Sequence, residues 1–193
     1  NLAVLYLTGR GAPRDVATSI AWHRRAAEQG LAAAQHGLGA FYYQGNGVKQ
    51  DFDEALKWFR LAADQGYANA QYNMAVMYFN EQGLKRDDIE IVKWVSLAAA
   101  QKFAPAEQRM GQMYENGIIF RKSPREALHW YRRAVAHGSK AATAGEARVA
   151  EMLAESGEGT PVPAGKAPPQ TAAADLETST RFLAPQSSHL MII

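Results

Sequence analysis

The sequence contains no cysteine among its 193 residues. This absence excludes a disulfide framework, a thiolate nucleophile and a cysteine-based zinc site. It leaves the redox compartment open, because a protein without thiols tolerates either environment. The sequence also lacks an apolar run near the roughly 18 residues that a membrane span requires. We therefore expect no membrane-spanning helix.

A strong excess of charge of one sign is missing as well. Lysine and arginine total 21 and aspartate and glutamate total 19, which leaves a formal charge of +2. The basic residues are spread among acidic ones and form only short pairs such as Arg24-Arg25 and Arg132-Arg133. Phosphate-binding surfaces usually show a clustered basic face. We expect solvated helix faces here and no nucleic-acid partner.

Motifs of known catalytic sites are also missing, including Gly-x-Ser-x-Gly and His-Glu-x-x-His. A phosphate-binding loop at Gly45-x-Gly47 would have to follow a strand and open a helix, whereas this pair recurs along the chain after helical segments. His129 and His137 are eight residues apart on one expected helix, but a metal site needs further ligands. We therefore predict no catalytic, cofactor-binding or metal-binding residues, and a protein that is not an enzyme.

What the sequence does contain is an internal repeat. The four tryptophans, Trp22, Trp58, Trp94 and Trp130, recur at intervals of 36 residues. Other residue types keep the same register, including Ala34, Ala70, Ala106 and Ala142, and Tyr6, Tyr42, Tyr78 and Tyr114. A fixed period of this length is typical of stacked repeat units, none of which can bury its apolar face without a neighbour.

Each unit is predicted to be a helix, a glycine loop, a second helix and a glycine turn. Apolar residues at helical spacing predict helices over 13–29, 34–43 and 52–65, and a last helix over about 140–155. Gly30 and its counterparts, the residues 36 positions away, end helices because glycine takes the left-handed conformation. The predicted fold class is all-α: a right-handed α-solenoid, or α/α superhelix, of stacked helix-turn-helix repeats with period 36.

The indoles are expected to anchor this array. Burying one removes about 150 to 250 Å² from water, which corresponds to about 4 to 6 kcal/mol before entropy is considered. Trp58→Ala is therefore expected to be the most damaging single change. Small residues at one repeat position are expected to let helix backbones approach closely: Gly39, Ala75, Gly111 and Ala147.

The third and fourth units depart from the pattern. Lys102 and Glu81 stand where other units have glycine. Lys102 either adopts positive φ, at a cost on the order of 1 kcal/mol, or the turn differs and Pro105 helps to set it. The loop over 118–120 carries apolar side chains that form either an exposed patch or a local filling.

The repeats divide the chain into two regions. Residues 1–155 form the array, with a partial first unit, about four units and a C-terminal capping helix whose outer face is polar. Residues 156–193, rich in Pro, Ala, Gly and Thr, are predicted to be a disordered tail. Its apolar end, 190–193, is either a docking peptide or an unstructured terminus. Because residues 1–11 match the second half of a first helix, we expect the sequence to begin inside a longer parent.

The segment from Ala34 to Gly66 reads Ala-x-x-x-Leu-Gly-x-x-Tyr, then Gly-x-Gly-Val-x-x-Asp, then Ala-x-x-Trp-Phe-x-x-Ala-Ala-x-x-Gly. This pattern resembles the Sel-one-like repeat, a relative of the tetratricopeptide repeat, over residues 1 to about 150. The resemblance implies a solenoid whose first helices line a concave face and which brings proteins together. It also implies a bacterial protein, with a periplasmic or secreted location favoured over a cytoplasmic one.

The face that remains for a partner lies on the first helices, at positions that packing does not use. Asparagine and arginine can each make paired hydrogen bonds to backbone or carboxylate groups, and aromatic residues supply buried anchors. The candidate partner-binding residues are Tyr43, Asn73, Phe79, Asn80, Arg109 and Gln112. The alternative is a hydrated face without a dedicated ligand.

Two functions follow from this reading. The first is a non-enzymatic scaffold or adaptor that binds a protein or peptide along the concave face. The second is a regulatory or targeting module of a larger enzyme or of a secretion or envelope assembly whose catalytic part lies elsewhere.

Overall fold

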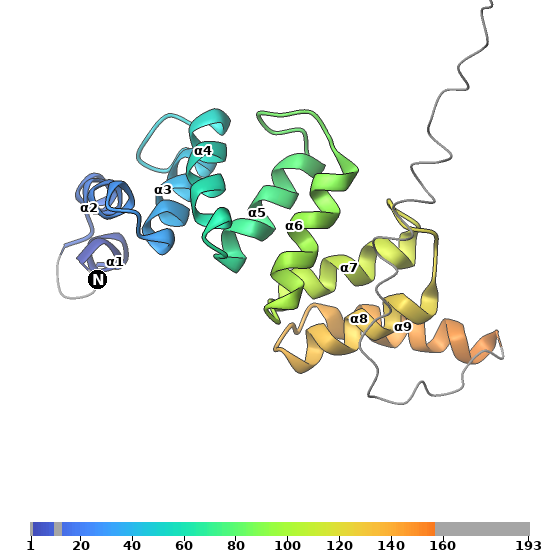
Figure 1. The fold of residues 1–193 in the computed structure, drawn as a ribbon. Coiled ribbons are helices and arrows are strands. Elements are labelled where there is room, and N and C mark those ends of the chain that lie inside the picture. The colour runs from blue at the N-terminus through green and yellow to red at the C-terminus, as the bar shows by residue number, and fades with distance from the viewer. Residues whose placement is uncertain (1, 10–12, 157–193) are drawn as a thin grey trace, which may run out of the picture.

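The computed structural model describes residues 2–9 and 13–156, and all regular structure in these residues is helical (Figure 1). The helices follow one another as pairs that stack into an elongated array, the expected α-solenoid. The predicted tail after Ser156 lies outside the described residues. The helices are α1 (Leu2–Thr8), α2 (Val16–Glu28), α3 (Ala32–Gln44), α4 (Phe52–Asp64), α5 (Ala68–Phe79), α6 (Asp88–Ala100), α7 (Ala104–Asn116), α8 (Pro124–Ala136) and α9 (Ala142–Glu155).

The second helix of each unit begins at a capping side chain that also recurs every 36 residues. The Asp51 carboxylate accepts hydrogen bonds from the backbone N–H groups of Asp53 and Glu54, both at 3.0 Å. Asp15 accepts the N–H of Thr18 in the same way, so α2 begins at Val16 and not at residue 13 as predicted. A capping carboxylate satisfies N–H groups that the first helical turn leaves open.

The turns reuse one backbone conformation even where glycine is absent. Lys102 has φ 61° and Glu81 has φ 56°, so both adopt the left-handed conformation of the glycines that they replace. Ile119 does the same, with φ 68°, where Gly47 and Gly83 stand in earlier units. Of the two alternatives for Lys102, positive φ is the one observed, and the solenoid geometry therefore overrides the steric preference of these side chains.

The prediction that all four indoles are buried is wrong for one of them. Trp58 and Trp94 are 8% and 3% exposed, whereas Trp22 is 37% exposed. Trp58 packs in a cluster with Ile20 and Ala27 of α2, the second helix of the preceding unit. The described residues contain no such helix before α2, so the indole of Trp22 lacks this covering neighbour.

The small residues on the first helices accommodate rings and not helix backbones, which corrects the expectation. A Cβ atom added at Gly39 would lie 2.7 Å from Cδ1 of Phe59, and one added at Gly111 would lie 2.8 Å from Cδ1 of Tyr131. Ala147, expected at such a contact, is exposed. In α9, Gly145 is the residue that faces the ring of Tyr131, which belongs to α8. Gly39 and Gly111 therefore make room for an aromatic residue of the following helix, and Gly145 makes room for one of the preceding helix.

The apolar loop between α7 and α8 is a local filling. Phe120 is buried and stacks on Tyr114, with ring centroids 4.6 Å apart and an interplanar angle of 11°. Ile119 is half-buried and packs against the same core. Of the two alternatives for this loop, an exposed patch is excluded.

Candidate functional site

Several polar side chains that recur with the repeat form hydrogen bonds between helices of the array. Nε2 of Gln65 donates to Oε1 of Gln35 at 2.7 Å, and Nε2 of Gln101 donates to Oε1 of Gln71 at 2.8 Å. These amide pairs join the second helix of one unit to the first helix of the same unit. They fix the two helices of a unit relative to each other.

The fourth unit replaces this amide pair with ions. Glu107 is fully buried and lies 2.8 Å from the Arg133 guanidinium and 2.6 Å from Nδ1 of His137. His137 was considered above only as a possible metal ligand, and this contact was not predicted from the sequence. The sequence did contain a sign of this contact: the repeat position that holds Gln35 and Gln71 in the second and third units holds Glu107 in the fourth.

A second ionic cluster attaches the last helix. Arg148 of α9 makes two hydrogen bonds to the Glu115 carboxylate of α7, at 2.6 and 2.8 Å, and the Tyr131 hydroxyl donates to the same carboxylate at 2.6 Å. The Arg148 guanidinium holds the pKa of Glu115 below its usual value, and burial, reinforced by Glu115, raises the pKa of Tyr131. This cluster is a structural clamp on the capping helix.

Two of the six predicted partner-binding residues have contacts within the array. The Tyr43 hydroxyl donates to Oε1 of Gln82 at 2.9 Å, and its ring lies 5.6 Å from that of Phe52. The Asn73 side-chain amide lies 3.1 Å from Nε2 of His36, and burial lowers the pKa of that histidine. These side chains connect adjacent units, and their role in binding a partner stays a prediction.

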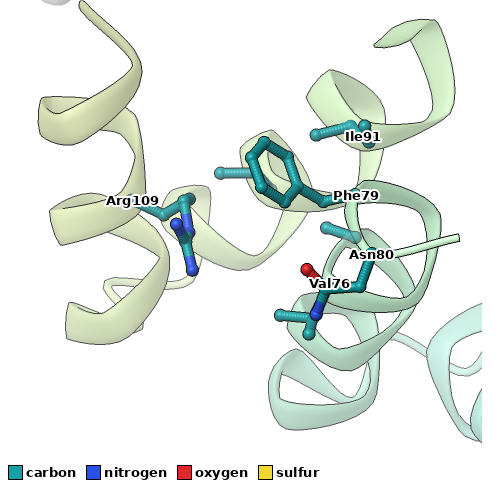
Figure 2. Close-up of a pocket in the computed structure, with 7 residues that line it drawn as sticks. Val76, Phe79, Asn80, Ile91 and Arg109 are labelled. Carbon is teal, nitrogen blue, oxygen red and sulfur yellow. The ribbon is translucent and has the colours of Figure 1, made fainter. Parts of the chain in front are cut away.

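Three other predicted residues meet at one place, a hollow between α5 and α7 (Figure 2). Phe79 and Asn80 come from the end of α5, and Arg109 reaches toward them from α7. Val76 and Ile91 complete the labelled lining, from α5 and α6. Gln112 is half-buried and lies outside the lining, so the structure brings together three of the six predicted residues.

Positive charge surrounds the apolar ring at this hollow. The guanidinium carbons of Arg86 and Arg109 lie 4.9 and 5.6 Å from the centroid of the Phe79 ring. Arg86 is paired with Asp88, with 2.8 Å between Nε and Oδ1. Within the part of the chain that the structure describes, the Arg109 guanidinium has no ion pair or hydrogen bond. Its donors are therefore available to an incoming acceptor.

Sequence reasoning missed the floor of the hollow. Ala75, Ile91 and Val95 line it, and only Ala75 was considered, as a packing position. The signal was present in the repeat: Val95 is much smaller than Phe59 and Tyr131, its counterparts in the neighbouring units.

Residues 2–9 and 13–156 show neither a metal-binding cluster nor a membrane-spanning helix. They hold no group of three or more histidine, aspartate or glutamate residues placed to bind a metal ion. None of their helices combines the length and the apolar character that crossing a bilayer requires.

The stacked helix pairs, the repeated caps and the ring contacts define an α-solenoid repeat protein. The chain belongs to the Sel1 repeat family, whose model matches residues 1–31, 32–67, 68–103 and 104–139. Sel1 repeat proteins are generally modules of protein–protein interaction. No curated protein matches the chain.

Two solved structures are similar over most of the chain. One is c5321, a protective antigen present in uropathogenic Escherichia coli strains that displays an SLR fold, with a TM-score of 0.73 and 36% identity over 80% of this chain. The other is a Sel1 repeat protein from Oxalobacter formigenes, with a TM-score of 0.73 and 28% identity over 94% of this chain. The chain spans 32% of the length of c5321 and 71% of the Oxalobacter protein.

Proposed function

We propose that this chain is a non-enzymatic interaction scaffold that binds a protein or peptide through the face formed by α5 and α7. The observation that carries the proposal is the convergence of Phe79, Asn80 and Arg109 on one hollow between two first helices. All three were expected on a binding face from repeat position alone. Membership of a family of interaction modules supports the same function.

The chemistry of this face suits an extended segment of another protein. The Asn80 side chain is exposed and has both a donor and an acceptor, which matches the backbone amide of a bound peptide. Arg109 adds a planar set of donors that suits a carboxylate. The apolar lining gives a buried anchor point, and such points carry most of the energy of an interface.

The test is a comparison of binding partners between the parent and the double variant Asn80→Ala/Arg109→Ala. The matched control is Arg14→Ala/Gln29→Ala, which removes an exposed arginine and an exposed amide from the first unit. We expect the first pair to remove the partners that the parent captures and the control pair to retain them. Unchanged partners for a folded Asn80→Ala/Arg109→Ala variant would exclude this face.

A further inference from the structure

The hollow arises because the third unit lacks the pairing of a glycine with an aromatic ring that the second and fourth units have. In the second unit Gly39 faces the Phe59 ring, and in the fourth unit Gly111 faces the Tyr131 ring. The third unit has Ala75 and Val95 at these two positions. A methyl group and an isopropyl group thus stand where the other units place a glycine and a ring.

The second unit shows where the absent ring would lie. The Phe59 ring centroid is 6.2 Å from that of Tyr43, and Tyr43 is the counterpart of Phe79. A ring at position 95 would therefore lie beside Phe79, in the lining of the hollow. Ile91 replaces the smaller Ala55 and Ala127 of the neighbouring units and fills part of the space. The space that remains is partly open and is about 10 Å³, which is room for about one water-sized group.

We propose that this hollow receives one methyl group of a small aliphatic side chain, alanine or valine, of a partner segment, and that an aspartate or glutamate beside it pairs with Arg109. This inference rests on the proposed function and names the chemistry of the partner. The size of the space selects a single methyl group over a ring, because a ring would not fit beside Phe79. The selectivity for a carboxylate comes from Arg109.

Charge complementarity favours an acidic peptide as the occupant. Arg86 is already neutralised by Asp88, which leaves Arg109 as the unpaired cation beside the hollow among the described lining residues. One available guanidinium above an apolar floor matches one carboxylate next to one aliphatic group. Nucleic acid requires several cations along its phosphates, and the lining of the hollow does not supply them.

The test uses a displayed library of random hexapeptides, selected on the parent protein. We expect the enriched peptides to contain alanine or valine next to aspartate or glutamate. Arg109→Gln should weaken their binding by about tenfold or more, as expected for a hydrogen bond to a charged group. It should leave unchanged the affinity of matched peptides that carry asparagine or glutamine at the acidic position.

A filling variant tests the hollow itself. Ala75→Gly/Ile91→Ala/Val95→Phe copies the residues that the second unit has at the same positions, so it is expected to fold with the same helices. Placing a ring in the hollow should reduce the affinity of the selected peptides by at least about tenfold, as expected when a buried anchor point is lost. Thermal unfolding of the variant checks that the fold is retained, and Arg109→Gln gives an independent answer if it is not.

The position of the bound peptide separates the two proposals. Changes in the NMR chemical shifts of backbone amides around Phe79 and Arg109 on peptide binding would support both proposals. Chemical-shift changes along α5 or α7 but away from the hollow, or equal affinity for the parent and for a folded filling variant, would refute this inference and leave the proposed function standing. Shifts confined to the outer faces of α4 and α6 would refute both. Failure to enrich any peptide, or binding of a single-stranded RNA that Arg109→Gln abolishes, would refute the inference.

Discussion

The second and fourth units have the same ring and glycine contacts but different polar links. Gln35 and Gln65 join the helices of the second unit through neutral amides, whereas the Glu107 carboxylate joins those of the fourth through its contacts with Arg133 and His137. The backbone conformation of the turns is shared, and so are the helix lengths. The apolar and small residues therefore set the fold, and the linking positions tolerate a change of chemistry.

The largest effect is expected at an indole that both types of unit share. Trp58→Ala should lower the free energy of unfolding by about 3 to 5 kcal/mol, because it empties a packed site in the core. It also removes the hydrogen bond from the indole Nε1 to Glu54. Trp22→Ala should cost less, about 1 to 3 kcal/mol, because that indole is partly exposed. Denaturant unfolding of the two variants measures the difference, and equal losses would contradict this account of the interior.

The ionic link of the fourth unit should show an intermediate effect. Glu107→Gln removes the buried carboxylate charge that Arg133 and His137 contact and should cost about 1 to 2 kcal/mol. Adding His137→Gln recreates the amide pair of the second and third units, and part of the lost stability should return. A double-mutant cycle measures this coupling. A double variant less stable than the sum of the single changes would show that the two types of link are not exchangeable.

The clamp on α9 should make the fourth unit sensitive to acid in a way that the second is not. The pKa of Glu115 is lowered from 4.5, chiefly by the hydrogen bond from Arg148. Its contribution is therefore fully present above pH 4.5 and is lost as the pH falls through the lower folded pKa. We expect Glu115→Gln to cost about 1 kcal/mol at pH 7 and to approach the parent in acid. Unfolding between pH 7 and 2 checks this, with the exposed Glu151→Gln as the control.

The smallest effect is expected at the turns. Lys102→Gly should raise the free energy of unfolding by less than about 1 kcal/mol, because it relieves a left-handed lysine while adding freedom to the unfolded chain. The reverse change, Gly66→Lys, occupies a position with φ +84° and nothing within 4 Å of an added Cβ, so its cost is confined to the backbone. Thermal unfolding measures the change in stability of both variants. Changes of the same sign in the two would contradict the explanation by backbone strain.

The repeat in the sequence was sufficient to predict the fold, because the period fixes the order and type of the helices. Trp22 shows where this reasoning fails: the same residue type in the same register is buried only when a neighbouring helix covers it. The Gly39 contact was assigned to the wrong partner, since spacing along one helix does not identify the side chain of the next. Phe79, Asn80 and Arg109 could be placed on one face by register, whereas the hollow between them depends on volumes in three helices.

The pairing of ring size with glycine has a consequence for how such arrays diversify. Gly39 with Phe59, and Ala75 with Val95, are matched exchanges at two fixed positions, and both leave the turns and caps in place. Exchanging these residue pairs between units would create the hollow in a different unit of the array. A binding site at the hollow would then change its position along the solenoid through coordinated substitutions at a few residues, while the helices, turns and caps stay the same.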